Sequence, residues 1–352
     1  MSGRVTLEDI AEASDTSVAS VSLALRNKPG VSRARRERIL AVAREMGYSR
    51  ETPVASPDES AVRSAAVLFR SITSDRPATP LMDSFYSWVV TGIQEAAQDA
   101  GLHLMLGALR CDANNVPVEL PPASFFDRAS SGLFLLGSFP DASLDRLIEI
   151  TGARGIPIVN VDGHTARTFV DSVGTMNREG AYEATSYLIQ RGHSRIAFAG
   201  RLDRNVPSFN QRLQGYREAM AAHGYPTREL TIRGDREVSP PIEADDLGVT
   251  AIVVGNDYDA TVLMRLLHGQ GVRVPEDVSI IGFDDTEHAT HVVPALTTMR
   301  VDMLTMGRLA VQAMAFRWSW PDAAPQMTLL RPQLVERDSV ASISGQDEHP
   351  TG

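Results

Sequence analysis

Residues 5–48 read VTLEDIAEASDTSVASVSLALRNKPGVSRARRERILAVAREMGY, and apolar residues recur in this stretch at three- and four-residue spacing. The spacing predicts three short helices. Thr6 can cap the first helix, Ser17 opens the second after a polar turn, and Ser32 caps the third. Two helices joined by a short turn and followed by a third are typical of a helix-turn-helix unit.

In such a unit, the first residues of the second helix enter the major groove of DNA. Val18 and Ala19 cannot form bidentate hydrogen bonds, so we expect them to contact thymine methyl groups, with serines reaching bases or phosphates. The alternative for Val18 is packing inside the unit. Arg33 and Arg36 suit phosphates. The complete set of candidate DNA contacts is Thr6, Ser17, Val18, Ala19, Ser20, Ser22, Leu23, Arg26, Gly30, Val31, Arg33 and Arg36.

The charge of the chain is unevenly distributed. The net charge is −10, yet residues 1–50 hold nine Lys and Arg against six Asp and Glu, which gives +3. The remaining residues hold 25 basic and 38 acidic side chains, which gives −13. A basic end on an acidic body favours contact with a polyanion through that end alone. The alternative is an ordinary arginine-rich helical surface.

Composition excludes several classes of protein. The 352 residues suggest two or three domains, and a hydrophobic content of 43% is that of a globular chain. No apolar run approaches the roughly 18 residues of a membrane-spanning helix, and acidic residues near the N-terminus argue against a signal peptide. Cys111 is the only cysteine, which excludes an internal disulfide and a multi-cysteine zinc site. We therefore expect a cytoplasmic protein.

The residues after the basic end resemble a linker. Pro53 and Pro57 oppose a regular helix, and the segment is rich in Ser and Glu. The predicted organisation is a DNA-binding head at 1–50, a proline-rich hinge or linker at 51–63, a two-lobed body at 64–340 and a disordered tail at 341–352.

The body alternates short apolar runs with longer helical patterns, which predicts parallel sheets covered by helices. About 270 residues exceed one such sheet, so we expect two lobes with a cleft at the carboxyl ends of their strands. Strands are predicted at Ala65–Phe69, Leu102–Leu106, Leu133–Leu136, Ile156–Val161, Arg195–Ala199, Thr250–Val254 and Val278–Ile281. Helices are predicted at Ser84–Ala100, Ser143–Ala153, Asn177–Gln190, Arg212–His223 and Asp257–His268.

Polar side chains at predicted strand ends make up a candidate ligand site. Carboxylates and amides bind hydroxyl groups, an arginine fork suits a hydroxyl pair or a carboxylate, and aromatic rings stack on a planar or sugar ring. Arg236 adds a cation that indicates an anionic ligand, with a solvated arginine as the alternative. The candidate effector contacts are Phe85, Tyr86, Ser138, Asp162, Ser208, Arg212, Arg236, Asn256 and Asp284.

Four neighbouring residues have simpler interpretations. Phe85 can be a core residue, and His193 is expected to be a structural histidine. Asp257 and Asp285 are expected to cap the helices that follow them.

The head, with Val-Ser after its turn and its closing Gly47-Tyr48, resembles the DNA-binding head of the LacI/GalR (lactose-repressor) family. The body resembles the effector-binding core of that family, which is related to periplasmic sugar-binding proteins. Matching strings include DSFYSWVVTGIQEAA from Asp83, NREGAYEATSYLIQRGHSRIAFAG from Asn177 and VPEDVSIIGFDD from Val274, and the resemblance covers residues 5–340.

The resemblance implies an α/β fold, with a three-helix helix-turn-helix head and a two-lobed periplasmic-binding-protein-like core of parallel sheets. It implies a sequence-specific transcriptional regulator, usually a repressor, whose operator affinity changes when a sugar or sugar derivative binds. The implied partners are a double-stranded DNA operator, a sugar-like effector and a second copy of the chain in a homodimer. An anionic effector is indicated by Arg236 alone, with the solvated arginine as the alternative.

The chain departs from the family pattern in three places. Members of the family insert a leucine of the hinge helix into the minor groove of the operator. In this chain Pro57 stands at that position, so we expect weaker binding to the operator. Between Asp112 and Ser131 a proline-rich stretch replaces most of a helix. Between Asp235 and Thr250 a short link replaces a crossover helix.

No motif indicates catalysis. The chain has no glycine-rich phosphate loop, HExxH or GxSxG motif, so we expect neither an enzyme nor a cofactor or metal. The rival hypothesis is a solute-binding sensor whose head no longer binds DNA specifically. A weaker rival is a sugar-modifying enzyme.

Overall fold

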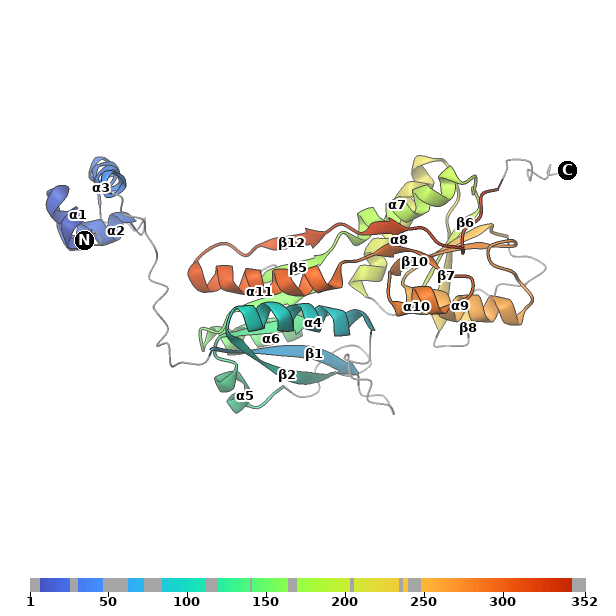
Figure 1. Ribbon diagram of the computed structural model, residues 1–352, viewed down its shortest axis with the longest axis horizontal. Coiled ribbons are helices and arrows are strands. Elements are labelled where there is room, and N and C mark those ends of the chain that lie inside the picture. The colour runs from blue at the N-terminus through green and yellow to red at the C-terminus, as the bar shows by residue number, and fades with distance from the viewer. Residues whose placement is uncertain are drawn as a thin grey trace. The chain divides into compact units, whose positions relative to one another are not determined.

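The computed structural model describes residues 7–25, 31–46, 63–72, 84–111, 120–139, 141–163, 170–202, 206–233, 237–239 and 248–343. The chain divides into two compact units, Met1–Ala61 and Val62–Gly352, each with its own hydrophobic core (Figure 1).

The first unit is the head, a bundle of three helices: α1 (Leu7–Ala13), α2 (Val18–Leu25) and α3 (Arg33–Glu45). One residue from each helix is fully buried at the centre, namely Ile10, Val21 and Ile39. The three helices predicted from the apolar spacing are confirmed, whereas the predicted cap Thr6 lies outside the described residues.

The second unit contains two lobes, and the first lobe is built on a sheet of six parallel strands in the order β12-β5-β4-β3-β1-β2. Alternate residues of β1 serve two layers: Ala65 and Val67 pack in one hydrophobic cluster with α4 and α11, whereas Leu68 packs with α5 and α6. The strands are β1 (Arg63–Ile72), β2 (Leu102–Cys111), β3 (Gly132–Leu136), β4 (Ile158–Val161), β5 (Asp171–Thr175) and β12 (Met327–Leu330). The helices are α4 (Ser84–Asp99), α5 (Ala123–Arg128), α6 (Asp141–Gly152) and α11 (Met303–Ser319).

The second lobe is built on seven strands in the order β13-β11-β10-β9-β6-β7-β8, antiparallel only at the two edges. Helices α7 and α8 pack in one hydrophobic cluster and α9 and α10 in another, so both faces of the sheet are covered. The strands are β6 (Ile196–Gly200), β7 (Arg228–Arg233), β8 (Glu237–Ser239), β9 (Ala251–Val254), β10 (Ser279–Asp284), β11 (Thr297–Arg300) and β13 (Gln333–Val335). The helices are α7 (Asn177–Gln190), α8 (Pro207–Ala222), α9 (Asp257–Gly269) and α10 (Glu287–His291).

The chain passes between the lobes three times, from β5 to α7, from β11 to α11 and from β12 to β13. The first and third crossings are hydrogen-bonded to each other, because Met176 N donates to Leu330 O at 2.9 Å. The predicted two-lobed architecture of parallel sheets is therefore confirmed (Figure 1).

All seven predicted strands and all five predicted helices are present; α7 has the predicted ends, and the ends of the others are shifted. Helix α8 begins at Pro207, five residues before the predicted start, because proline suits the first turn of a helix. Helix α5 is six residues long, and residues 112–119 and 240–247 lie outside the described part of the chain. Ile343 N donates to Arg191 O at 2.9 Å, so the ordered body extends past the predicted end at residue 340.

Candidate functional site

A polar cluster stands at the carboxyl ends of the strands of the first lobe. Tyr86, in the first turn of α4, donates its hydroxyl to Oδ2 of Asp162 at 3.0 Å. Gly137 follows β3 with φ +89°, and a Cβ there would lie 3.0 Å from the Tyr86 hydroxyl oxygen. Glycine therefore provides both the backbone conformation and the space that the tyrosine needs. The structure thus brings Tyr86 and Asp162 together, and the half-buried Ser138 follows Gly137 in the chain.

Phe85 belongs to the hydrophobic core, being 7% exposed. Its ring stands edge-on to the Tyr86 ring, with centroids 5.2 Å apart. Of the two interpretations of Phe85, the structure favours the core residue, which fixes the orientation of Tyr86.

The second lobe holds a buried arginine at the corresponding end of its sheet. Arg212 is 4% exposed and donates to three elements: Nε to Asn177 Oδ1 at 2.8 Å, Nη1 to Gly255 O at 2.5 Å, and Nη2 to Asp284 Oδ1 at 2.9 Å. Its guanidinium carbon lies 3.7 Å from the centroid of the Phe283 ring. Arg212 and Asp284 are brought together by α8 and β10, as their positions in the sequence suggested.

Burial raises the pKa of Asp284 to about 8; the Arg212 guanidinium opposes this shift, and the charges of Asp257 and Asp162 add to it. Asp162 belongs to the first lobe and Asp284 to the second, so the two clusters lie within electrostatic reach of each other. The backbone has a positive φ at both aspartates, +54° at Asp162 and +106° at Asp284, and residues other than glycine rarely adopt such angles. Strained residues of this kind are typical of ligand sites.

The predictions that Asp257 and Asp285 cap helices are both wrong, because Asn256 and Thr286 stand at the cap positions of α9 and α10. Asn256 is the cap of α9, because its Oδ1 accepts from Asp259 N at 2.7 Å. Asp257 is instead buried and accepts hydrogen bonds from outside its own helix. Asp285 pairs with Arg300 and Arg337, each at 2.6 Å. A cap and a buried acceptor have the same sequence signature, an aspartate after a strand, so only the fold distinguishes them.

The other predicted effector contacts are less well placed. Ser208 is half-buried in the first turn of α8, and Arg236 lies outside the described residues. His193 is buried, with its ring nitrogens 2.9 Å from Thr250 Oγ1 and 3.1 Å from Ala341 O, and burial lowers its pKa. It is therefore a structural histidine, as expected.

Sequence reasoning missed Asn177 and an ion pair at the end of β6. Arg201 Nε lies 2.9 Å from Oδ1 of the fully buried Asp259. The pair is separated by 58 residues, and no local pattern indicates it. Asn177 looked like an ordinary helix start.

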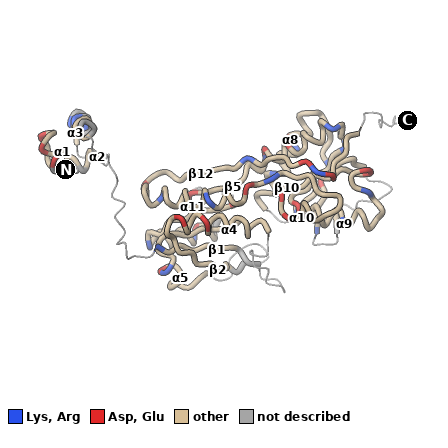
Figure 2. Tube along the Cα trace, in the orientation of Figure 1, with Lys and Arg blue, Asp and Glu red and all other residues tan. Residues whose placement is uncertain are grey.

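The candidate DNA surface is on α2 and α3 of the head. Val18 is 41% exposed and takes no part in the head core, so its packing alternative is wrong. The Ser17 hydroxyl accepts from Ser20 N at 3.2 Å and caps α2. Basic residues gather on α3 (Figure 2). Of the other predicted DNA contacts, Leu23 is half-buried and Val31 packs against the head core. Helix α2 also carries Ala19 and Ser22, and α3 carries Arg33 and Arg36. Three more lie outside the described residues, namely Thr6, Arg26 and Gly30.

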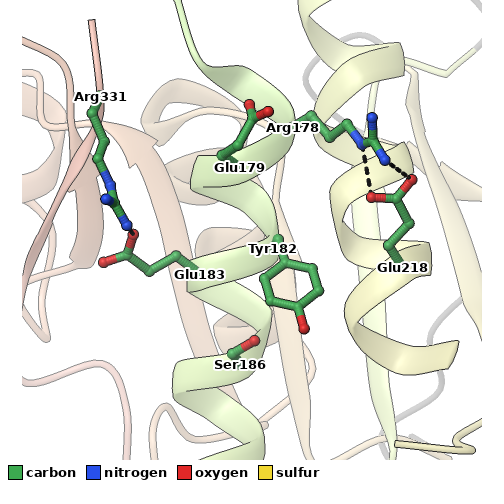
Figure 3. Close-up of a pocket in the computed structure, with 7 residues that line it drawn as sticks. All are labelled: Arg178, Glu179, Tyr182, Glu183, Ser186, Glu218 and Arg331. Atoms are coloured by element: carbon green, nitrogen blue, oxygen red, sulfur yellow. Dashed lines mark hydrogen bonds and ion pairs between the residues drawn. The ribbon is translucent and has the colours of Figure 1, made fainter. Parts of the chain in front are cut away.

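An open pocket of about 550 Å³ lies elsewhere, lined mainly by α7, with one residue each from α8 and from the segment after β12 (Figure 3). Arg178 of α7 pairs with Glu218 of α8 at 2.7 Å, and Arg331 after β12 pairs with Glu183 of α7 at 3.3 Å. Its lining residues, Arg178, Glu179, Tyr182, Glu183, Ser186, Glu218 and Arg331, include none of the predicted effector contacts.

None of the helices that the structure describes has the length and apolarity that crossing a membrane requires. Within the same residues, no group of three or more His, Cys, Asp or Glu side chains is arranged to hold a metal ion.

Sequence models of two protein families match the chain: "Bacterial regulatory proteins, lacI family" over residues 6–51, and "Periplasmic binding protein-like domain" over residues 185–340. The chain is 25% identical over 349 residues to the probable HTH-type transcriptional repressor ExuR of Bacillus subtilis, covering 97% of this chain and 99% of that protein. It is 29% identical over 348 residues to the HTH-type transcriptional repressor PurR of Yersinia pestis, covering 96% and 97%.

Two solved structures share the fold. A LacI family regulator from Enterococcus faecium with bound ribose is 22% identical, with a TM-score of 0.65 over 80% of this chain and 100% of that one. The lac repressor dimer bound to operator and the anti-inducer ONPF is also 22% identical, with a TM-score of 0.59 over 96% and 100%. Head and body both match one family along nearly the whole chain, and the protein therefore belongs to the LacI family of bacterial regulatory proteins.

Proposed function

We propose that this protein is a transcriptional repressor that binds an operator through α2 of its head and responds to a small molecule bound by the Tyr86–Asp162 and Arg212–Asp284 clusters. The observation that carries the proposal is that one chain contains both a DNA-binding head and a ligand-binding body. One is a helix-turn-helix head with Val18 exposed at the start of its second helix, and the other is a body whose polar groups converge at strand ends.

The ligand class follows from the groups that face each other. Asp162 and Asp284 accept hydrogen bonds, Arg212 and Tyr86 donate them, and an aromatic ring suits the apolar face of a sugar. Arg212 already donates through Nε, Nη1 and Nη2 within the protein, so an uncharged sugar fits these clusters better than the anionic ligand that Arg236 indicated. The related regulator that holds ribose supports the same class.

Regulation by this ligand requires a different affinity for two arrangements of the lobes. In a homodimer, two heads occupy half-sites about one helical turn apart, and a change in head spacing changes the affinity for the operator. The lac repressor, which resembles this chain in fold, is a dimer in its operator-bound structure. The site performs no chemistry in this proposal, so bound sugar should be recovered unchanged.

The test of DNA binding is a gel shift with the DNA upstream of the protein's own gene, at a stated salt concentration and with random competitor. Wild-type protein should give a competitor-resistant complex. Val18→Asp should abolish that complex, because a carboxylate would meet the base edges and phosphates. Val18 is exposed, so the variant should keep the melting temperature of the wild type.

Val18→Ala is the matched control: it removes methyl contacts without adding charge and should weaken the complex by about tenfold, the effect of 1.4 kcal/mol. A Val18→Asp protein that binds as tightly as wild type would exclude α2 as the recognition helix. If sugars stabilise the protein in a thermal-shift screen but no duplex is preferred over random DNA, the solute-binding sensor replaces the repressor.

A further inference from the structure

The carboxylate of Asp257 joins three elements beneath the proposed ligand site. Asp257 is the first residue of α9 and is fully buried. Its Oδ2 accepts from the Thr286 backbone N at 2.7 Å and from the Thr286 hydroxyl at 3.3 Å, and its Oδ1 accepts from the Thr298 hydroxyl at 2.6 Å. Thr286 lies between β10 and α10, and Thr298 lies in β11. One buried side chain thus holds the loop that follows Asp284.

That loop has a backbone that needs to be held. Asp284 and Asp285 have φ angles of +106° and +58°. Such conformations are unfavourable for residues other than glycine and persist only where the surroundings fix them. Asp285 is bound by Arg300 and Arg337, and two residues after Asp284 the chain is bound at Thr286 by Asp257. The loop is therefore clamped from both sides.

Strand β10 leaves room for this carboxylate. A Cβ on Gly282 would collide with Oδ1 of Asp257 and with the Leu296 side chain. The glycine before Phe283 and Asp284 therefore lets the carboxylate approach the strand.

We propose that Asp257 is a positioning residue that fixes the 284–286 loop, and with it the carboxylate that Asp284 offers to Arg212 and to the ligand. The part of this proposal that concerns the ligand rests on the proposed function, whereas the part that concerns the loop does not. The loop also reaches a lobe crossing, because Val301 N donates to the Asp284 backbone O at 3.1 Å where the chain leaves β11 for α11. Its conformation is thus tied to the segment that moves if the lobes rearrange.

Protonation gives the proposal a measurable signature. Burial raises the pKa of Asp257 to about 7; the hydrogen bonds from Thr298 and Thr286 lower it, and the charge of Asp285 raises it. The other charged groups at the loop are Asp284, Arg212, Arg300 and Arg337. When the loop opens, Asp257 meets water and its pKa returns towards about 4. The closed loop therefore holds a proton that the open loop releases, and opening becomes easier as pH rises towards 7.

The test is hydrogen–deuterium exchange of the peptide covering residues 284–287 in the full chain, without DNA or sugar, from about pH 5 to about pH 8, corrected for the intrinsic exchange rate. Asp257→Asn cannot titrate, and its amide group has the donor and the acceptor of the protonated carboxyl that the wild type holds at low pH. At about pH 5, its loop should therefore open about as readily as that of the wild type. The ratio of the two opening constants should change by about tenfold per pH unit and level off near pH 7.

Thr298→Val distinguishes positioning from simple packing. It removes a hydrogen bond that lowers the pKa of Asp257, so the levelling should move to higher pH. Asp302→Asn is the matched control: it alters an exposed aspartate that caps α11 and should keep the wild-type profile.

A ratio that is independent of pH for Asp257→Asn would overturn the proposal. If that variant does not fold, an unshifted levelling point in Thr298→Val overturns it instead. Because no ligand or DNA is present, failure of the proposed repressor function leaves this result unaffected, and the two failures are distinguishable.

Discussion

At Arg212, a single side chain satisfies acceptors from three elements, Asn177 of α7, Gly255 after β9 and Asp284 of β10. Replacing it by methionine leaves these buried acceptors without their donor and leaves Asp284 without a counter-charge. We expect Arg212→Met to lower the free energy of unfolding by about 3–5 kcal/mol, measured by urea denaturation at constant pH.

The same helix provides the control for this prediction. Arg217 pairs with Glu229, but its side chain is 53% exposed, so Arg217→Met should cost about 0–1 kcal/mol. Arg212→Lys should be intermediate, because lysine keeps the charge but cannot form the three-way fork or stack on Phe283. If Arg212→Met and Arg217→Met lower the free energy of unfolding by equal amounts, the burial of Arg212 contributes nothing to stability.

Residues of the site were predictable where their place beside a strand or helix in the sequence determines where they lie in the fold. Arg212, Asp162 and Asp284 stand at or after recognisable strands and helices, so their convergence follows from parallel topology. Asn177 and the Arg201–Asp259 pair were missed because their partners lie 35 and 58 residues away, at distances set by packing.

At the level of elements, two helices of the first lobe approach each other through glycine. A Cβ on Gly92 of α4 would collide with the Leu304 backbone O of α11, and a Cβ on Gly307 would collide with the Val89 backbone O. We expect Gly307→Ala to force the helices apart and to cost about 1–3 kcal/mol, measured by urea denaturation. Gly152 lies at the end of α6 with open space around it, so Gly152→Ala should be neutral or stabilising by up to about 1 kcal/mol. If Gly152→Ala lost as much unfolding free energy as Gly307→Ala, the collision would not explain the loss.

Elements with strong local periodicity were the predictable ones. Strands β3 and β4 are buried throughout and read as continuous apolar runs. The edge strands β12 and β13 escaped prediction because β12 is mostly exposed and pairs with β5 about 155 residues away, while β13 has three residues. Helix α11 was also missed, although its buried Met303, Met306, Ala310 and Met314 recur at helical spacing and were a usable signal.

For the whole molecule, the sequence already separated a basic end from an acidic body, and the structure divides the chain into two units after Ala61. The body has extensive cores in both lobes, whereas the buried core of the head, among its described side chains, is formed by Ile10, Ala11, Val21, Ala24, Ile39 and Ala43. A unit of roughly 60 residues buries a smaller share of its surface than a larger domain and is correspondingly marginal.

We therefore expect a chain that begins at Val62 to unfold at the same temperature as the body of the intact protein and to keep its response to sugar. The isolated residues 1–61 should melt at a lower temperature, because so small a core offsets little of the entropy of ordering the chain. Differential scanning calorimetry of the three proteins checks this, with circular dichroism following the helices of the head. A lower melting temperature for the chain that begins at Val62 would mean that the head stabilises the body, and the two units would then fold as one.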